Sequence, residues 1–293
     1  MKRARIALAV GILCISIFPI LVKLNLTPGV ISAFYRMLFS FVLILPYVLI
    51  IKQFKIPKTQ TAILAALCGV IFGSDVAVWN IAIQESTATQ ASLLTNLSPI
   101  WVGVLMLLFY KDKPINFWIG TAIAVIGMVL LVGFTVFKDL YFDRAFSFGV
   151  LSGVFYAFYM LISKRVLKTM NVLTFMTISL CASSVYLSIV SFLLNEPFSG
   201  FSNSGWLVLV AQAVICQLLA WILISYATKY MRATRVSVSL LAQGILASFL
   251  AWLFIDETIT LQMVVGGIIL LFGIRITFYN KPVFRQGLLK KPE

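Results

Sequence analysis

Polar segments divide this chain into ten apolar runs, each close to the length of a membrane-spanning helix. Crossing the hydrocarbon layer of a bilayer, roughly 30 Å thick, takes about 20 residues of α-helix, and a spanning segment must satisfy its backbone hydrogen bonds internally. Only 11% of the residues are charged, whereas about 25% is typical of soluble domains. We therefore expect an all-α membrane protein with ten transmembrane helices, at about residues 6–22, 29–51, 60–83, 87–109, 116–136, 146–163, 172–194, 205–227, 234–254 and 260–279.

Basic residues gather in alternate polar segments, and this pattern sets the expected orientation. Eighteen of the 23 Lys and Arg residues lie in six segments of one side, which include the N-terminus and the C-terminal tail. The other side holds three basic residues and six of the nine acidic ones. Because cytoplasmic loops are rich in Lys and Arg, we expect both termini in the cytoplasm. The net charge of +14 is then a topology signal of a multi-pass protein of the cell (inner) membrane, whose partner is the lipid bilayer and not nucleic acid.

The second half of the chain repeats the first half in an inverted sense. A gapless alignment of residues 82–112 with residues 227–257 gives eight identities in 31 pairs. In this register the basic segment Lys111–Lys113 faces the acidic segment Asp256–Thr258, so the charged ends have changed places. Each half holds five expected helices, and an odd number also requires that the second copy be inserted upside down. The sequence thus predicts two inverted five-helix repeats.

These boundaries define four expected regions of the chain. They are a first five-helix repeat, an outer linker, a second five-helix repeat and a basic cytoplasmic tail, at residues 1–137, 138–145, 146–279 and 280–293.

Two ionisable residues, Arg36 and Asp75, fall well inside expected helices. Counted from the outer ends of their helices, both lie roughly 11–13 Å deep at 1.5 Å per residue. Charged groups at this depth are costly and usually face a partner or a watery cavity. We expect the two to pair, which would hold the carboxylate in its charged form. The pair could fix one helix against the next, or Asp75 could exchange the arginine for a substrate amine or a proton during transport.

Other polar and aromatic residues are candidates for the lining of a cavity between the halves. Amides can orient a solute, and aromatic rings can cover its apolar or cationic parts, although Trp is also common at membrane interfaces and a lone Gln often links two helices. Pro99 would kink the fourth helix and free the carbonyl group of Thr95. The candidates beside Arg36 and Asp75 are Trp79, Asn80, Asn96, Pro99, Gln217, Trp221 and Gln243, with Tyr156 and Tyr159 as weaker ones.

The sequence offers no basis for a cofactor or a metal site. It has no histidine, and its four cysteines all fall inside expected spans. Catalysis would need clustered acids, His or Cys in convergent geometry, so an intramembrane enzyme is the least favoured function. We expect neither a cofactor nor a metal, and buried cysteines rather than a disulfide framework.

Several motifs resemble the EamA type of the drug/metabolite transporter superfamily, over nearly the whole chain. They are Arg36, Asp75–Trp79 and Ala88–Pro99 in the first half, and Gln217–Trp221, Ser225–Ala227, Phe254–Glu257, Gly266, Gly267 and Gly273 in the second. Two positions depart from the family's pattern: Gly244 replaces a second-half proline, and Lys111-Asp112 replaces a first-half Gly-Glu. The resemblance implies ten helices in two repeats, a central cavity, alternating access and, often, export of amino acids or other metabolites.

The leading expectation is therefore a secondary transporter, not an enzyme, that exports amino acids or related small metabolites around a midplane cavity. Proton coupling through Asp75 and transport without a proton both remain open, as does the oligomeric state. The alternative is an exporter of multiple drugs or lipophilic cations. That function would need a buried carboxylate with aromatic neighbours, which Asp75 and Trp79 would provide if Arg36 pointed elsewhere.

Overall fold

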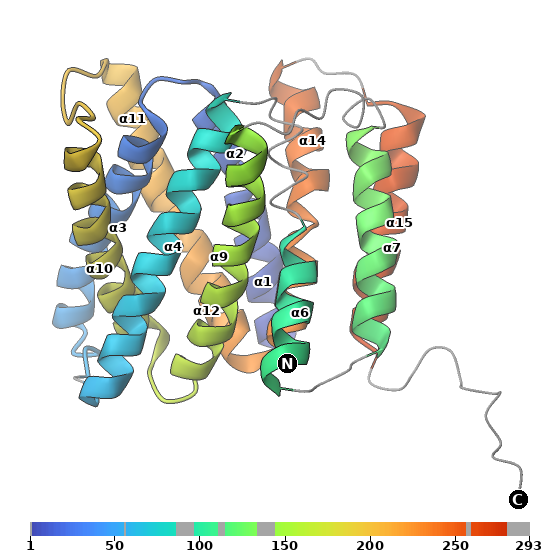
Figure 1. The fold of residues 1–293 in the computed structure, drawn as a ribbon, viewed down its shortest axis with the longest axis horizontal. Coiled ribbons are helices and arrows are strands. Elements are labelled where there is room, and N and C mark those ends of the chain that lie inside the picture. The colour runs from blue at the N-terminus through green and yellow to red at the C-terminus, as the bar shows by residue number, and fades with distance from the viewer. Residues whose placement is uncertain are drawn as a thin grey trace, which may run out of the picture.

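The computed structural model describes residues 2–55, 57–85, 97–110, 115–133, 144–255 and 259–279. This part of the chain forms helices and contains no strand, which agrees with the all-α class expected from the sequence (Figure 1). The helices are α1 (Lys2–Ile15), α2 (Phe18–Lys23), α3 (Gly29–Ile50), α4 (Thr59–Glu85), α6 (Ser98–Tyr110), α7 (Ile115–Val132), α9 (Arg144–Val166), α10 (Val172–Leu193), α11 (Asn203–Ala211), η1 (Gln212–Leu219), α12 (Ala220–Tyr230), α13 (Ala233–Leu240), α14 (Gln243–Ile255) and α15 (Leu261–Thr277).

Most helical segments of the described chain have the length and composition of membrane-spanning helices. Eight helical segments are long and apolar enough to cross a bilayer, and each coincides with one of the ten apolar runs of the sequence. The other two runs correspond to shorter apolar helices, Ser98–Phe109 and Leu261–Thr277. The protein is thus a multi-pass membrane protein, and the full count of ten crossings stays a prediction.

Two of the spanning segments are interrupted within their length. The first breaks between α1 and α2, where Pro19 occupies the first turn of α2, a position that proline tolerates because its missing N–H has no helical partner there. The ninth breaks at Leu241 and Ala242, between α13 and α14. This break occurs without a proline, since residues 233–255 contain none.

The eighth segment contains a π-helical stretch that the sequence did not indicate. The eight residues of η1 lie between α11 and α12. A π-helix bonds each N–H to the carbonyl five residues back, and such stretches are rare and concentrate at functional sites. Its neighbour is α3, whose polar residues contact it.

Glycines allow several helix pairs to approach closely. Gly69 of α4 lies against the backbone of Ser179 on α10, where a Cβ atom could not fit. On the other side of the molecule, Gly127 of α7 and Gly266 of α15 face each other in the same way. Without a hydrophobic driving force between helices in lipid, such close van der Waals packing holds membrane helices together. The α7/α15 pair stands at one edge of the bundle (Figure 1).

Both ends of the described chain lie at the same end of the bundle (Figure 1). There the guanidinium of Arg5, near the start of α1, lies 5.2 Å from the ring centre of Phe278, just after α15. At the opposite end Arg144 and Glu85 form an exposed ion pair of 3.7 Å between their Nε and Oε2 atoms.

Candidate substrate cavity

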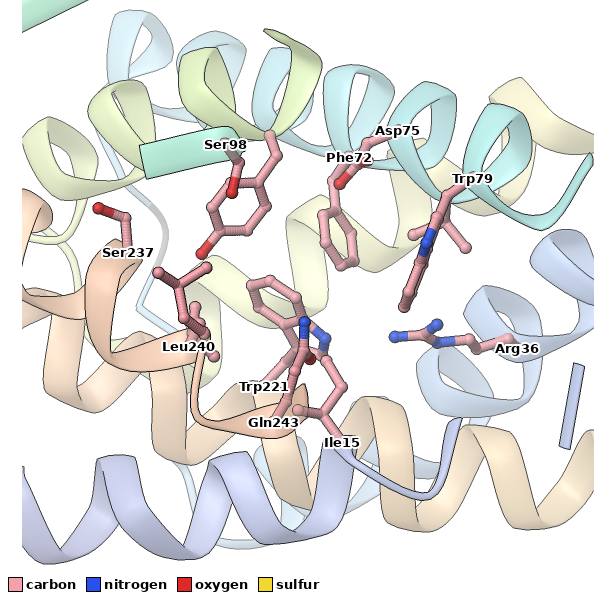
Figure 2. Close-up of a pocket in the computed structure, with 13 residues that line it drawn as sticks. Ile15, Arg36, Phe72, Asp75, Trp79, Ser98, Trp221, Ser237, Leu240 and Gln243 are labelled. Atoms are coloured by element: carbon pink, nitrogen blue, oxygen red, sulfur yellow. The ribbon is translucent and has the colours of Figure 1, made fainter. Parts of the chain in front are cut away.

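A buried cavity lies between the two halves of the described chain (Figure 2). Its volume is about 50 Å³, which is room for a few water molecules. Residues 2–133 contribute α1, α3, α4 and α6 to its wall, and residues 144–279 contribute α9, α12, α13 and α14. The lining residues are Ile15, Arg36, Phe72, Asp75, Val76, Trp79, Ser98, Tyr156, Trp221, Ser237, Leu240, Leu241 and Gln243.

Arg36 reaches the cavity from α3 and is fully buried. Its Nε donates to Oε1 of Gln217 at 2.8 Å, and Nη2 lies 3.4 Å from the carbonyl oxygen of Cys216. The ring centre of Phe18 lies 3.9 Å from the guanidinium carbon, a cation–π arrangement that partly compensates the buried charge. The remaining nitrogen, Nη1, is buried and has no hydrogen-bond partner in the described protein. Both N–H groups of this nitrogen are therefore left for a ligand.

Asp75 reaches the same cavity from α4 and is 5% exposed. Its Oδ1 accepts a 2.6 Å hydrogen bond from the hydroxyl of Ser152 on α9. No ion pair joins Asp75 to Arg36 within the described residues, so the expected direct pair is not formed. The sequence placed both groups at one depth, but Ser152 and Gln217 from neighbouring helices are their hydrogen-bond partners instead.

Aromatic rings cover much of the wall between the two charged groups. Trp79 packs on Phe18 with 4.9 Å between ring centres, and Trp221 packs on Phe72 at 4.4 Å. Figure 2 shows Trp79 extending from α4 beside the Arg36 guanidinium. The indole Nε1 atoms of both tryptophans and the hydroxyl of Tyr156 are buried without a hydrogen-bond partner in the described residues. An aromatic cage with unused donors thus surrounds the cavity.

The interruption of the ninth segment brings polar groups into this wall. Gln243 is the first residue of α14 and lines the cavity, and Ser237 lines it from α13. Pro99 is the second residue of α6 and directly follows Ser98, which also lines the cavity. Asn96 lies outside the described residues, so the structure neither supports nor contradicts its role or a kink around Pro99.

Four of the described sequence candidates do not belong to the lining: Pro99 and three residues that contact other parts of the protein. Asn80 donates from Nδ2 to the carbonyl oxygen of Gly29 at 3.0 Å and so links α4 to the start of α3. Gln217 accepts the hydrogen bond from Nε of Arg36 but does not itself line the cavity. Tyr159 is buried against Phe72 and Trp221, with ring centres 4.7 Å and 5.5 Å away.

Sequence reasoning missed several lining or supporting residues. Phe72 and Val76 share a helix face with Trp79 at a spacing of three to four residues, so the helical period could have indicated them. Ser152 directly precedes Gly153, and Gly149, Gly153 and Ala157 form a stripe of small residues at four-residue spacing. Such a stripe indicates close contact with another helix. Leu241 carries no such signal, because it lies in the break between α13 and α14.

The arrangement is suited to binding a small molecule with separated charges. Arg36 offers a positive donor, Asp75 a carboxyl group, and the aromatic rings an apolar cover. Within the described residues no group of three or more His, Cys, Asp and Glu side chains could hold a metal ion. The four cysteines are free thiols.

Comparison with known proteins gives a family match along the whole chain. Residues 3–133 and 144–279 each match the model of the EamA-like transporter family. An uncharacterized transporter of Archaeoglobus fulgidus is 25% identical over 248 residues, which span 84% of this chain and 85% of that protein. An uncharacterized transporter of Bacillus subtilis strain 168, YdfC, is 25% identical over 254 residues, 86% of this chain and 82% of the relative. A solved crystal structure superposes with a TM-score of 0.77 at 14% identity, covering 94% of this chain and 97% of its own, and so shares the fold.

Proposed function

The chain belongs to the EamA-like transporter family of the drug/metabolite transporter superfamily, and from that premise we propose that it exports amino acids or related small metabolites across the cell inner membrane. The proposed mechanism is alternating access of one midplane site, without a cofactor. Transport, not catalysis, is the activity that the family carries.

The main support for this substrate class is the pair of opposite charges that face one cavity without neutralising each other. The Nη1 atom of Arg36 has no hydrogen-bond partner in the described protein and lies at the cavity wall. It can take a substrate carboxylate, for which the planar guanidinium is well shaped. Across the wall, Ser152 donates to Oδ1 of Asp75, which leaves acceptor capacity on the carboxylate for a substrate amine. An amino acid carries both complementary groups.

The aromatic rings supply the remaining part of such a site. A side chain held between Trp79 and Trp221 would rest on apolar ring faces, while the indole N–H groups and the Tyr156 hydroxyl offer further donors. Ligand sites are commonly built in this way, from an apolar wall with a few convergent polar groups.

The small size of the cavity fits an occluded state of a transport cycle. A volume of about 50 Å³ is too small for an amino acid, so loading requires the surrounding helices to move apart. The wall is divided between the two halves of the chain, and relative rocking of the halves would therefore open it on one side or the other.

Two observations support an inverted-repeat architecture with ten crossings. The family model matches twice, once in each half. The helix contacts also correspond when the halves are exchanged: α1 packs on α12 as α9 packs on α4, while α3 with α10 and α7 with α15 join equivalent helices. We propose residues 1–137 and 146–279 as the repeats, 138–145 as the outer linker and 280–293 as a cytoplasmic tail. The basic end, which holds both chain ends, would face the cytoplasm.

A comparison of the culture medium around expressing cells tests the function directly. Cells that produce the protein, cells that produce Asp75→Asn and cells with empty vector would be compared by untargeted metabolite profiling, with membrane insertion of both proteins measured. We expect an amino acid or related metabolite to accumulate outside only with the intact protein. Equal media from all three strains would contradict export.

The alternative, export of lipophilic cations, is favoured by one observation. Asp75 has no ion-pair partner within the described chain and lies in an aromatic cavity, which suits a buried cation. The positive Arg36 in the same wall opposes it. Resistance of expressing cells to cationic dyes, with no change in medium metabolites, would favour this alternative over metabolite export.

A further inference from the structure

A second, larger cavity of about 820 Å³ lies at the basic end of the bundle. Helices α4, α6, α9 and α13 form its wall. It shares no lining residue with the central cavity. It is therefore a separate site.

The mouth of this cavity is strongly basic. Lys164, Arg165, Lys168 and Arg232 line it, and its described lining includes no acidic residue. Lys164 donates to the carbonyl oxygens of Thr228 and Lys229 at 2.7 and 2.8 Å, which fixes it at the C-terminal end of α12. Arg165, Lys168 and Arg232 are exposed, and their side chains have no hydrogen-bond or ion-pair partner among the described residues. Three positive side chains are thus available for an anion.

Below the mouth the wall becomes apolar and opens sideways. Along α9, Phe158, Leu161 and Ile162 line the cavity together with Arg165. Phe158 lies seven residues before Arg165, a depth of about 10 Å at 1.5 Å per residue. Phe158 is 36% exposed, and exposed apolar side chains of a spanning helix face lipid. The cavity therefore joins a positive mouth to an apolar crevice that is open to the bilayer.

We propose that this cavity binds an anionic phospholipid, with its phosphate at Arg165, Lys168 and Arg232 and one acyl chain against Phe158 and Ile162. Basic pockets between transmembrane helices on the cytoplasmic side are suited to acidic headgroups, and each Lys or Arg near the surface adds to the attraction. A free phosphate would use the mouth but leave the crevice without an occupant. The apolar wall thus argues for a lipid.

Native mass spectrometry of the purified full-length protein can count the bound lipid. The wild type would be mixed in detergent with dioleoyl phosphatidylglycerol or with dioleoyl phosphatidylcholine, which has the same chains but no net charge. The test variant is Lys168→Gln/Arg232→Gln. The control variant is Lys2→Gln/Arg3→Gln, which removes two charges at the same end of the bundle from exposed residues outside this cavity.

We expect the wild type and the control variant to retain the anionic lipid in preference to phosphatidylcholine, and the test variant to bind it about tenfold more weakly. Equal retention of both lipids by the wild type would overturn the proposal. So would equal loss in the two variants, because the effect would then be general to basic charge. Glycerol 3-phosphate serves as the free-phosphate probe, and competition by it as strong as by the lipid would show an anion site and contradict the lipid.

Discussion

The side chains of Arg36 and Gln217 join the two halves of the chain, with 2.8 Å between Nε of the arginine and Oε1 of the glutamine. The contact belongs to a polar seam between α3 and the π-helical stretch η1. One turn earlier, Ser32 donates to Oε1 of Gln212 at 2.8 Å, and one turn later Ser40 donates to the carbonyl oxygen of Ala213 at 3.0 Å. Within the seam, Nε and Nη2 of Arg36 contact oxygen atoms of η1. The third nitrogen, Nη1, has no hydrogen-bond partner in the described residues.

Replacing Gln217 should therefore damage both stability and substrate binding. In Gln217→Leu the Nε of Arg36 loses its acceptor, and an unsatisfied buried donor costs about 1–3 kcal/mol. We expect a lower unfolding temperature in detergent and a raised KM for transport. Gln217→Glu is the control for stability alone, because it keeps an oxygen acceptor at the same place but adds a negative charge beside the guanidinium. Equal falls of the unfolding temperature in both variants would contradict the proposed positioning of Arg36 by this residue.

Arg36→Lys should not preserve transport even though it preserves the charge. A lysine ammonium carries its three donors on one atom, so it cannot reproduce the planar fork that holds Gln217 with one nitrogen and presents another to the cavity. We expect transport to fall about tenfold or more, since a lost charge-assisted hydrogen bond costs about 1.5–3 kcal/mol. Size-exclusion chromatography would verify that the variant is folded. Wild-type transport by Arg36→Lys would show that the fork of the guanidinium is not used.

Variants of Asp75 and Ser152 should distinguish the effect of the carboxylate charge from the effect of the carboxylate's orientation. Asp75→Asn removes the negative charge, so we expect an inserted protein without transport and without any response to an imposed pH gradient. Ser152→Ala keeps the charge but removes a 2.6 Å hydrogen bond, so we expect a higher KM with transport retained. Uptake of labelled substrate into inside-out vesicles, at several pH gradients, measures both. Normal transport by Asp75→Asn would exclude this carboxylate from the mechanism.

Much of the fold could be predicted from the sequence, because a lipid bilayer restricts spanning segments to long apolar helices. Apolar run length placed the eight long helices. Depth alone also brought Arg36 and Asp75 to one cavity. Their pairing was wrong because depth does not fix how each helix is rotated, and Ser152 and Gln217 come from helices whose positions only tertiary packing determines.

Two backbone features were invisible in the sequence for a related reason. The π-helical stretch η1 has no proline or glycine to indicate it. The break at Leu241 and Ala242 likewise follows no local helix breaker before it, yet it brings Leu241 and Gln243 to the cavity. Both depend on contacts with other helices, which outweigh local helix propensity.

The α7/α15 pair offers a stability test with neighbouring glycines. A Cβ atom at Gly266 would overlap the backbone of Leu131 and lie 2.8 Å from the carbonyl oxygen of Gly127, which cannot move without shifting α7. At Gly267 the nearest atom is a methyl carbon of Leu131 at 3.6 Å, an ordinary contact. Both glycines are buried in the same helix, so the two alanine variants differ mainly in what the new methyl group meets.

We expect Gly266→Ala to lower the free energy of unfolding by about 1–3 kcal/mol through overpacking, and Gly267→Ala to be neutral or stabilising by up to about 1 kcal/mol through helix propensity. A thiol-reactive dye can follow unfolding, because Cys14, Cys68 and Cys216 are buried free thiols that become accessible as the bundle opens. Equal unfolding temperatures for the two variants would mean that α7 and α15 can separate at little cost, and the pair would then not be a rigid edge of the bundle.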